Sequence, residues 1–339
     1  NGIKLFGADG FKWDDAAEDD LEQRLAAPAA LELDSVLEPE IDASLARFYL
    51  EHLERSLPEG TPLDGLAVAL DCANGAASPF ARQLFEDLGA DVVVIGDRPN
   101  GENINLDCGS TRPERLIELV RERRADLGVA FDGDADRAVL VDETGALQDG
   151  DSVLYLWARE LQRQGRLEPA AVVATTMSNL GLEHALARLE IDVVRCDVGD
   201  RAVVETMRRD GILLGGEQSG HIIHLGFGST GDGLLTAVQM AALVARADRP
   251  LSELAAPVER FPQILVNVPV GSKPPFETVP SIVERARAVE ERLGRDGRLL
   301  LRYSGTEPLA RVMIEGRDQQ EIEALANELA QEIGASLGG

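Results

Sequence analysis

Three aspartates at alternate positions between two apolar runs constrain this chain more than any other feature. The segment 129–142 reads VAFDGDADRAVLVD. Its apolar ends are typical of β-strands, and a glycine in the middle lets the backbone turn. Asp132, Asp134 and Asp136 can then converge on one point, and carboxylates without a nearby His or Cys favour a hard cation, Mg²⁺ before Ca²⁺. Because Mg²⁺ held by few protein ligands usually binds phosphate as well, residues 132–137, the Asp loop, predict magnesium and phosphate chemistry.

Three other interpretations compete with a magnesium site. Aspartates also favour solvated turns, but the D-x-D-x-D-R spacing between two strand-like runs makes this interpretation weaker. An EF-hand would use Glu143, which is twelfth from Asp132, but its sixth position needs Gly and here is Arg137. A phosphatase would use Asp132 as the nucleophile together with a distant lysine, and the chain contains only three lysines.

Strand-like and helix-like segments alternate through most of the chain. Residues 62–148 give strands and helices in turn and end in the Asp loop, and residues 149–255 repeat this order in outline. Such alternation predicts mostly parallel sheets with ligand-binding loops at the carboxyl ends of the strands. The expected fold class is α/β, with tandem α/β/α domains at 46–148 and 149–258 and a smaller α+β domain at 259–339.

Composition restricts the partners and the compartment. The net charge of −27 argues against nucleic acid and anionic membranes as partners. The chain has no apolar run near 18 residues and no signal-peptide pattern, so we expect a cytoplasmic protein. Its three cysteines are far apart, which fits a reducing compartment and disfavours disulfides or a zinc site. In so acidic a chain the position of each Lys or Arg is informative.

A second polar segment lies between two predicted strands near the carboxyl end. Residues 302–307 read RYSGTE. Gly305 frees backbone N–H groups to approach an anion, and the flanking hydroxyls of Ser304 and Thr306 add donors. Two nearby arginines, Arg302 and Arg311, supply positive charge. The segment therefore predicts a phosphate site, although S-G-T between strands also forms ordinary turns.

A third polar segment, residues 216–221, reads GEQSGH. Residues two apart on an extended segment face the same side, so Glu217 and Ser219 can hydrogen-bond sugar hydroxyls together. His221 is placed to act as an acid, a base or a phosphate donor. The alternative is a strand with polar outward positions. Lys4 is a candidate phosphate counter-charge or acid–base group, with simple solvation as the alternative.

Together these residues resemble the α-D-phosphohexomutase family. The Asp loop, the GEQSGH segment and the RYSGTEP segment occur in the family's order and at similar spacing, and the resemblance covers the whole chain. Segments 99–105 (PNGENIN) and 108–111 (CGST), with Gln218, are most similar to the phosphoglucosamine mutases of this family. Phosphomannomutases and phosphoglucomutases are the alternative.

The resemblance implies a mutase that interconverts glucosamine 6-phosphate and glucosamine 1-phosphate for amino-sugar nucleotide and cell-wall precursor synthesis. A phosphoserine would donate its phosphoryl group, and a bisphosphorylated sugar would reorient and return the other one. Mg²⁺ is the implied cofactor and a homodimer the implied assembly. The implied roles are metal binding by Asp132, Asp134 and Asp136, catalysis by Lys4, Arg137 and His221, sugar binding by Glu217 and Ser219, and phosphate binding by Arg302, Ser304, Gly305, Thr306 and Arg311.

The chain departs from the family pattern in two places. No serine loop of the family type occurs in the sequence, so residues 1–45 are expected to be the remainder of a phosphoserine domain whose serine lies upstream. The alternative is a sugar-phosphate-binding protein without catalysis. Ala135 stands where a second glycine is common, and we expect its methyl group to be tolerated.

Overall fold

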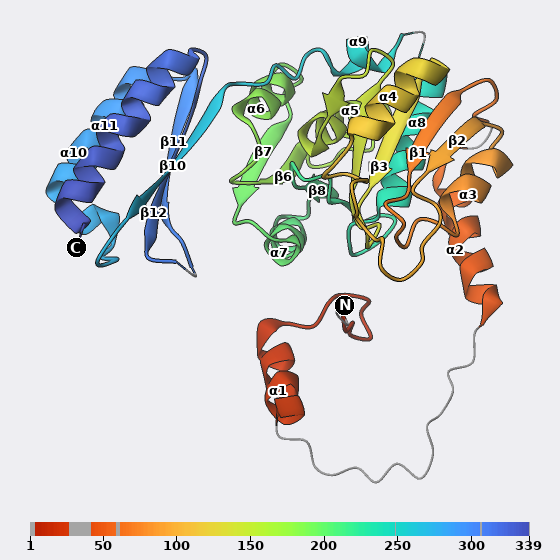
Figure 1. Cartoon of the computed structure of the whole chain (residues 1–339), viewed down its shortest axis with the longest axis horizontal. Helices are drawn as coiled ribbons and strands as arrows, with labels where there is room; N and C mark the ends of the chain where they lie inside the picture. The colour runs from red at the N-terminus through yellow and green to blue at the C-terminus, as the bar shows by residue number, and fades with distance from the viewer. Residues whose placement is uncertain (1–3, 27–41, 59–61, 248, 306, 339) are drawn as a thin grey trace. The chain divides into compact units, whose positions relative to one another are not determined.

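The computed structural model describes residues 4–26, 42–58, 62–247, 249–305 and 307–338 (Figure 1). These residues form two compact units. The first unit comprises Asn1–Ser178 and Leu186–Pro257, and the second comprises Asn179–Ala185 and Val258–Gly339. No helix in the described part of the chain is both long and apolar enough to cross a membrane.

The first sheet of the first unit has the strand order β2-β1-β3-β4-β5. Strands β1, β2 and β3 are parallel to one another, and β4 is antiparallel to both of its neighbours, β3 and β5. Every residue of β3 and β4 is buried, because their apolar runs pack on both faces of the sheet. The bounds are β1 Ala67–Asp71, β2 Asp91–Ile95, β3 Leu127–Phe131, β4 Ala138–Asp142 and β5 Leu147–Gln148, with helices α3 Ala81–Asp87 and α4 Glu114–Arg123.

The second sheet of this unit has the order β7-β6-β8-β9, with only β9 antiparallel. Helix α8 is apolar around most of its circumference and is almost wholly buried, as expected of a core helix. The bounds are β6 Ala171–Thr175, β7 Asp192–Cys196, β8 Leu214–Gly216, β9 Ile222–His224, α5 Gly150–Arg163, α6 Leu180–Ala187, α7 Asp200–Asp210, α8 Gly233–Arg246 and α9 Leu251–Ala255. Two further helices precede both sheets, α1 Asp15–Ala26 and α2 Ala43–Ser56.

The second unit is a small antiparallel sheet covered by two helices. Its strand order is β10-β12-β11, and α10 and α11 pack together. The core joins apolar residues of the sheet and both helices, for example Ile282, Ile314 and Leu329. The bounds are β10 Gln263–Pro269, β11 Gly297–Tyr303, β12 Leu309–Gly316, α10 Pro280–Leu293 and α11 Gln319–Leu337, with a short 3₁₀ turn at Phe276–Thr278.

The expected fold class is confirmed, with tandem α/β layers followed by an α+β domain. Both larger sheets carry an antiparallel hairpin at one edge, β3–β4 and β8–β9. Each hairpin loop holds one of the predicted site segments. The polar loops therefore lie at the carboxyl ends of β3 and β8, where parallel strands place ligand sites.

A buried ion pair generates a stability prediction for the second unit. Glu315 is 0% exposed, pairs with Arg298 at 2.6 Å and accepts a hydrogen bond from Asn179 Nδ2 at 3.1 Å. Glu315→Ala leaves these donors without their carboxylate, so the free energy of unfolding of this unit should fall by about 3 kcal/mol. Urea-dependent hydrogen exchange of peptides from β12 measures it.

The matched control is Glu321→Ala. Glu321 pairs with Arg292 at 2.7 Å, but their side chains are 39% and 64% exposed. This substitution should cost less than about 1 kcal/mol, because water screens exposed pairs. Equal losses in the two variants would contradict a structural role for the buried pair.

Candidate active site

Two hairpin loops from different sheets of the first unit meet through their backbones. The Asp loop joins β3 to β4, and residues 217–221, the acid loop, join β8 to β9. Ala138 N donates to Gly220 O at 3.1 Å. A Cβ built on Gly220 would lie 2.4 Å from Ala138 O, so only glycine permits this approach. The fold thus brings together two of the three predicted segments.

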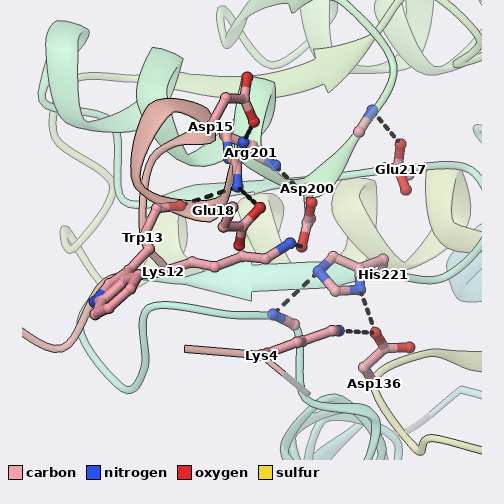
Figure 2. A network of polar contacts seen from close by, with 12 residues as sticks. Lys4, Lys12, Trp13, Asp15, Glu18, Asp136, Asp200, Arg201, Glu217 and His221 are labelled. Atoms are coloured by element: carbon pink, nitrogen blue, oxygen red, sulfur yellow. Dashed lines mark hydrogen bonds and ion pairs between the residues drawn. The ribbon is translucent and has the colours of Figure 1, made fainter. Parts of the chain in front are cut away.

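Three predicted residues lie close to Asp136, and Figure 2 shows two of them, Lys4 and His221. Lys4 Nζ donates to Asp136 Oδ2 at 3.3 Å, and His221 Nδ1 lies 3.6 Å from the same oxygen. Arg137 Nε lies 3.9 Å from the other carboxylate oxygen. The hydrogen bond from His221 is the largest cause that lowers the pKa of Asp136, and the lysine adds to it. Asp136 therefore stays ionised.

The imidazole of His221 is held on both sides. Its side chain is 2% exposed, and Nε2 accepts a hydrogen bond from Gly231 N at 3.2 Å. Because Nε2 is the acceptor, the proton of a neutral ring sits on Nδ1 and faces Asp136. Our sequence analysis predicted an acid, a base or a phosphate donor. The structure places both ring nitrogens beside protein groups, and the role of His221 in catalysis stays a prediction.

The other carboxylates of the Asp loop show what the site can bind. Burial, and then the neighbouring Asp136, raise the pKa of Asp132 to about 6, whereas Asp134 is exposed. No group of three or more His, Cys, Asp or Glu side chains is close enough to hold a metal ion within the described ranges. The three aspartates nevertheless fit a hard divalent cation. All of the donors are carboxylates, and the carboxylates of Asp132 and Asp136 lie next to each other. The three-aspartate ligand set stays a prediction.

The amino-terminal end of α8 supports the Asp loop from behind. Gly233 N donates to Ala135 O at 2.9 Å, and a Cβ on Gly233 would lie 2.6 Å from Arg137 O. Ala135 itself has φ +59°, a left-handed conformation that costs a non-glycine residue about 1–2 kcal/mol. The backbone of Ala135 is therefore strained, and the tolerance of its methyl group stays a prediction. This strain persists because the neighbouring segments fix the loop.

Glu217 and Ser219 of the acid loop are linked to each other and to α7. Glu217 Oε1 accepts from Gly199 N at 3.1 Å, and Ser219 Oγ donates to Glu217 Oε2 at 3.4 Å. Gly199 immediately precedes α7, so the carboxylate is tied to the start of that helix (Figure 2). The serine is exposed and half of the carboxylate's hydrogen-bonding capacity remains for a ligand.

Arg201 on α7 is a candidate that sequence reasoning missed. Its guanidinium donates to Trp13 O at 2.9 Å and to Glu18 at 2.7 Å, and it contacts Asp15 (Figure 2). These contacts hold the segment that follows Lys4 against α7. A cavity of about 350 Å³ lies between that segment and α7. The sequence signal was an arginine near the start of a predicted helix, in a chain whose acidic residues outnumber its basic residues by 60 to 33.

The second unit concentrates positive charge around Ser304. Arg302 and Arg311 are directly opposite on β11 and β12, so their like charges repel each other, and Arg311 also pairs with Glu307 at 3.3 Å. Arg311 Nε is buried and has no hydrogen-bond partner among the described residues. A Cβ on Gly305 would touch nothing within 4 Å, so space remains beside the backbone. Thr306 lies outside the described residues.

Lys273 is a second candidate that the sequence analysis did not select. Its Nζ donates to Ser304 O at 2.6 Å, and Ser304 is 4% exposed. Arg311 donates to Ser304 Oγ at 3.4 Å. The signal was available, because Lys273 is one of three lysines in the chain. Its distance in sequence from the RYSGTE segment concealed it.

Three family models match the chain, all of them phosphoglucomutase/phosphomannomutase domains. Alpha/beta/alpha domain II matches residues 47–145, alpha/beta/alpha domain III matches 149–261 and the C-terminal domain matches 265–332. The fold and the site thus define a phosphohexomutase type of enzyme.

Similar proteins agree with this class. Phosphoglucosamine mutases of Syntrophotalea carbinolica and Rhizobium meliloti are each 47% identical, over 100% and 98% of this chain and 75% of their own length. A phosphoglucomutase/phosphomannomutase family protein from Burkholderia thailandensis superposes with a TM-score of 0.74 at 23% identity, over 95% of this chain and 70% of its own. The Aspergillus fumigatus N-acetylphosphoglucosamine mutase in complex with GlcNAc-6P and magnesium gives 0.65 at 22% identity, over 84% and 68%. The chain belongs to the phosphoglucomutase/phosphomannomutase family, and spans about three quarters of the length of the phosphoglucosamine mutases it matches.

The contact between α8 and the Asp loop generates a prediction. Gly233→Ala places a methyl group against two carbonyl oxygens of the loop, so the first unit should lose about 2 kcal/mol of unfolding free energy. Urea unfolding followed by the fluorescence of the buried Trp157 measures this loss.

Gly334→Ala is the control. It is also a helical glycine, but its nearest neighbour would be Val268 at 3.7 Å. This alanine should leave the urea unfolding of the first unit unchanged, because Gly334 lies in the second unit and its new methyl group has normal contact distances. A neutral Gly233→Ala would show that the loop does not depend on this close approach.

Proposed function

We propose that the protein is a phosphoglucosamine mutase that interconverts glucosamine 6-phosphate and glucosamine 1-phosphate. The observation that carries the proposal is the convergence of Lys4 and His221 on Asp136, where two loops meet. The 47% identity with phosphoglucosamine mutases along the whole chain supports this choice among sugar phosphates. The resemblance implies that a phosphoserine donates the phosphoryl group. None of the site residues named above is that serine.

Asp132, Asp134 and Asp136 would hold Mg²⁺ on the Asp loop. Bound Mg²⁺ supplies neutralisation of the negative charge on the transferring phosphoryl group. The neighbouring residues would position the Asp136 carboxylate and the phosphate. His221 and Lys4 keep Asp136 ionised and oriented, and Lys4, which is partly exposed, offers its ammonium group to a phosphate as well. Arg137 adds a second cation whose buried Nε has no hydrogen-bond partner in the described chain.

Glu217 and Ser219 would bind hydroxyl groups of the sugar. A carboxylate fixed by a backbone N–H keeps one acceptor for a ligand, and a hydroxyl adds both a donor and an acceptor. Hydrogen bonds of this kind orient a hexose through its neutral hydroxyl groups. They suit a substrate that must bind in two orientations, because hydroxyl groups are distributed around the ring.

Arg302, Arg311 and Lys273 would bind the phosphate that does not react. Arg311 and Lys273 contact Ser304 in the second unit, and Arg302 is the cross-strand partner of Arg311. Planar guanidinium groups match phosphate oxygens bidentately. An anion there would also relieve the repulsion between the paired arginines.

A substrate panel tests the proposed specificity. The full-length protein purified from its native source is assayed with glucosamine 1-phosphate, mannose 1-phosphate and glucose 1-phosphate in Mg²⁺. We expect kcat/KM to be at least about tenfold higher for the amino sugar, because a site with a polar partner for a substituent discriminates against analogues that lack it. A rate with mannose phosphate equal to or above that with glucosamine phosphate would reject the choice of substrate.

The phosphate grip is tested by a lysine substitution. Arg311→Lys keeps the charge but removes the planar donor pair, so the affinity of the chain for glucosamine 6-phosphate should fall about tenfold in calorimetry. Arg317→Lys, two residues beyond Glu315 at the other end of β12 and 55% exposed, should leave the affinity unchanged. Equal affinities of the two variants would place the phosphate elsewhere.

A further inference from the structure

A largely buried tyrosine–aspartate pair connects α2 to the start of α8. Tyr49 Oη lies 2.9 Å from each carboxylate oxygen of Asp232. Burial, and then the charge of Asp232, raise the pKa of Tyr49, so its hydroxyl keeps the proton and donates it. The ring also packs edge-on against Phe80, with 5.7 Å between centroids. The position of Tyr49 is therefore fixed by both polar and apolar contacts.

Asp232 occupies the N-cap position of α8. Its Oδ1 accepts from Leu235 N at 2.9 Å, which satisfies one of the donors that a helix start leaves open. The residues on either side contact the site. Gly231 N donates to His221 Nε2 at 3.2 Å, and Gly233 N donates to Ala135 O at 2.9 Å. Three consecutive residues, 231–233, therefore join Tyr49 to both loops.

We propose that Tyr49 is a positioning residue for the Asp loop, acting through Asp232 and the amino-terminal end of α8. Three observations carry this inference. The hydroxyl uses both oxygens of the capping carboxylate, α8 meets the loop without room for a Cβ, and Ala135 is held in a left-handed conformation. A strained loop that bears three like charges needs an external restraint. The consequence for metal affinity rests on the proposed function, whereas the restraint itself does not.

The same two helices supply a matched control. Further along α8, Gln239 Nε2 donates to Ser56 O at 3.0 Å and to Ser56 Oγ at 2.8 Å. Ser56→Ala thus removes a hydrogen bond between α2 and α8 that does not lead to the Asp loop. A purely structural role for Tyr49 would make Tyr49→Phe and Ser56→Ala equivalent. A positioning role separates them.

The primary test is hydrogen exchange of the metal-free chain, followed by mass spectrometry of peptides that cover residues 131–138. Tyr49→Phe should accelerate exchange of this segment about fivefold, since a hydrogen bond to a charged group is lost, and Ser56→Ala should leave it at the wild-type rate. Unchanged exchange in Tyr49→Phe, or equal acceleration in both variants, would overturn the proposal.

The second readout is Mn²⁺ titration monitored by electron paramagnetic resonance, because Mn²⁺ takes the same oxygen ligands as Mg²⁺. Tyr49→Phe should raise the dissociation constant about fivefold and Ser56→Ala should not. Faster loop exchange without any Mn²⁺ binding by the wild-type chain would contradict the metal site of the proposed function and support the positioning role. Weaker Mn²⁺ binding with unchanged exchange would overturn the positioning role.

Discussion

The close backbone contacts around the Asp loop are the feature on which the rest of the site depends. Three carboxylates on six residues repel one another, and such a loop does not keep its conformation by itself. Ala76 N donates to Gly133 O at 2.8 Å, and contacts from Gly220 and Gly233 hold the loop on other sides. Each contact comes from a different part of the first unit. The fold therefore surrounds the negative charge with close backbone contacts in which Gly75, Gly220 and Gly233 leave no space for a Cβ.

The positions of several Lys and Arg side chains also depend on the charge of the site. The chain has 33 Lys and Arg against 60 Asp and Glu, and some of these cations lie in the predicted site segments or contact them. Lys4 forms an ion pair with Asp136. In the second unit Arg311 and Lys273 contact Ser304, and Arg302 is the cross-strand partner of Arg311. Cations that pair with protein carboxylates hold loops in position. Arg302 and Arg311 oppose each other on β11 and β12, and among the described residues Arg311 forms an ion pair only with the half-exposed carboxylate of Glu307, which a phosphate could replace.

The sequence predicted the features that depend on local patterns. Apolar runs of five residues indicated β3 and β4, and glycines and aspartates indicated the loop between them. Local patterns of this kind were enough to predict the fold class. Features that depend on contacts between distant segments were not predictable. The burial of His221 follows from Gly231 and Asp136, and the nearness of Lys273 to Ser304 follows from pairing in the second unit. The left-handed backbone at Ala135 is likewise imposed by α8, not by its own side chain.

Diffraction at the manganese absorption edge, from crystals of the protein grown with Mn²⁺, tests the central claim most directly. The account predicts an anomalous peak bonded to oxygens of Asp132, Asp134 and Asp136, with metal–oxygen distances of about 2.2 Å. It also predicts that the backbone of the Asp loop keeps its contacts with Gly220 and Gly233. No peak at saturating Mn²⁺, or a peak bonded to other residues, would contradict the assignment of the Asp loop as the metal site.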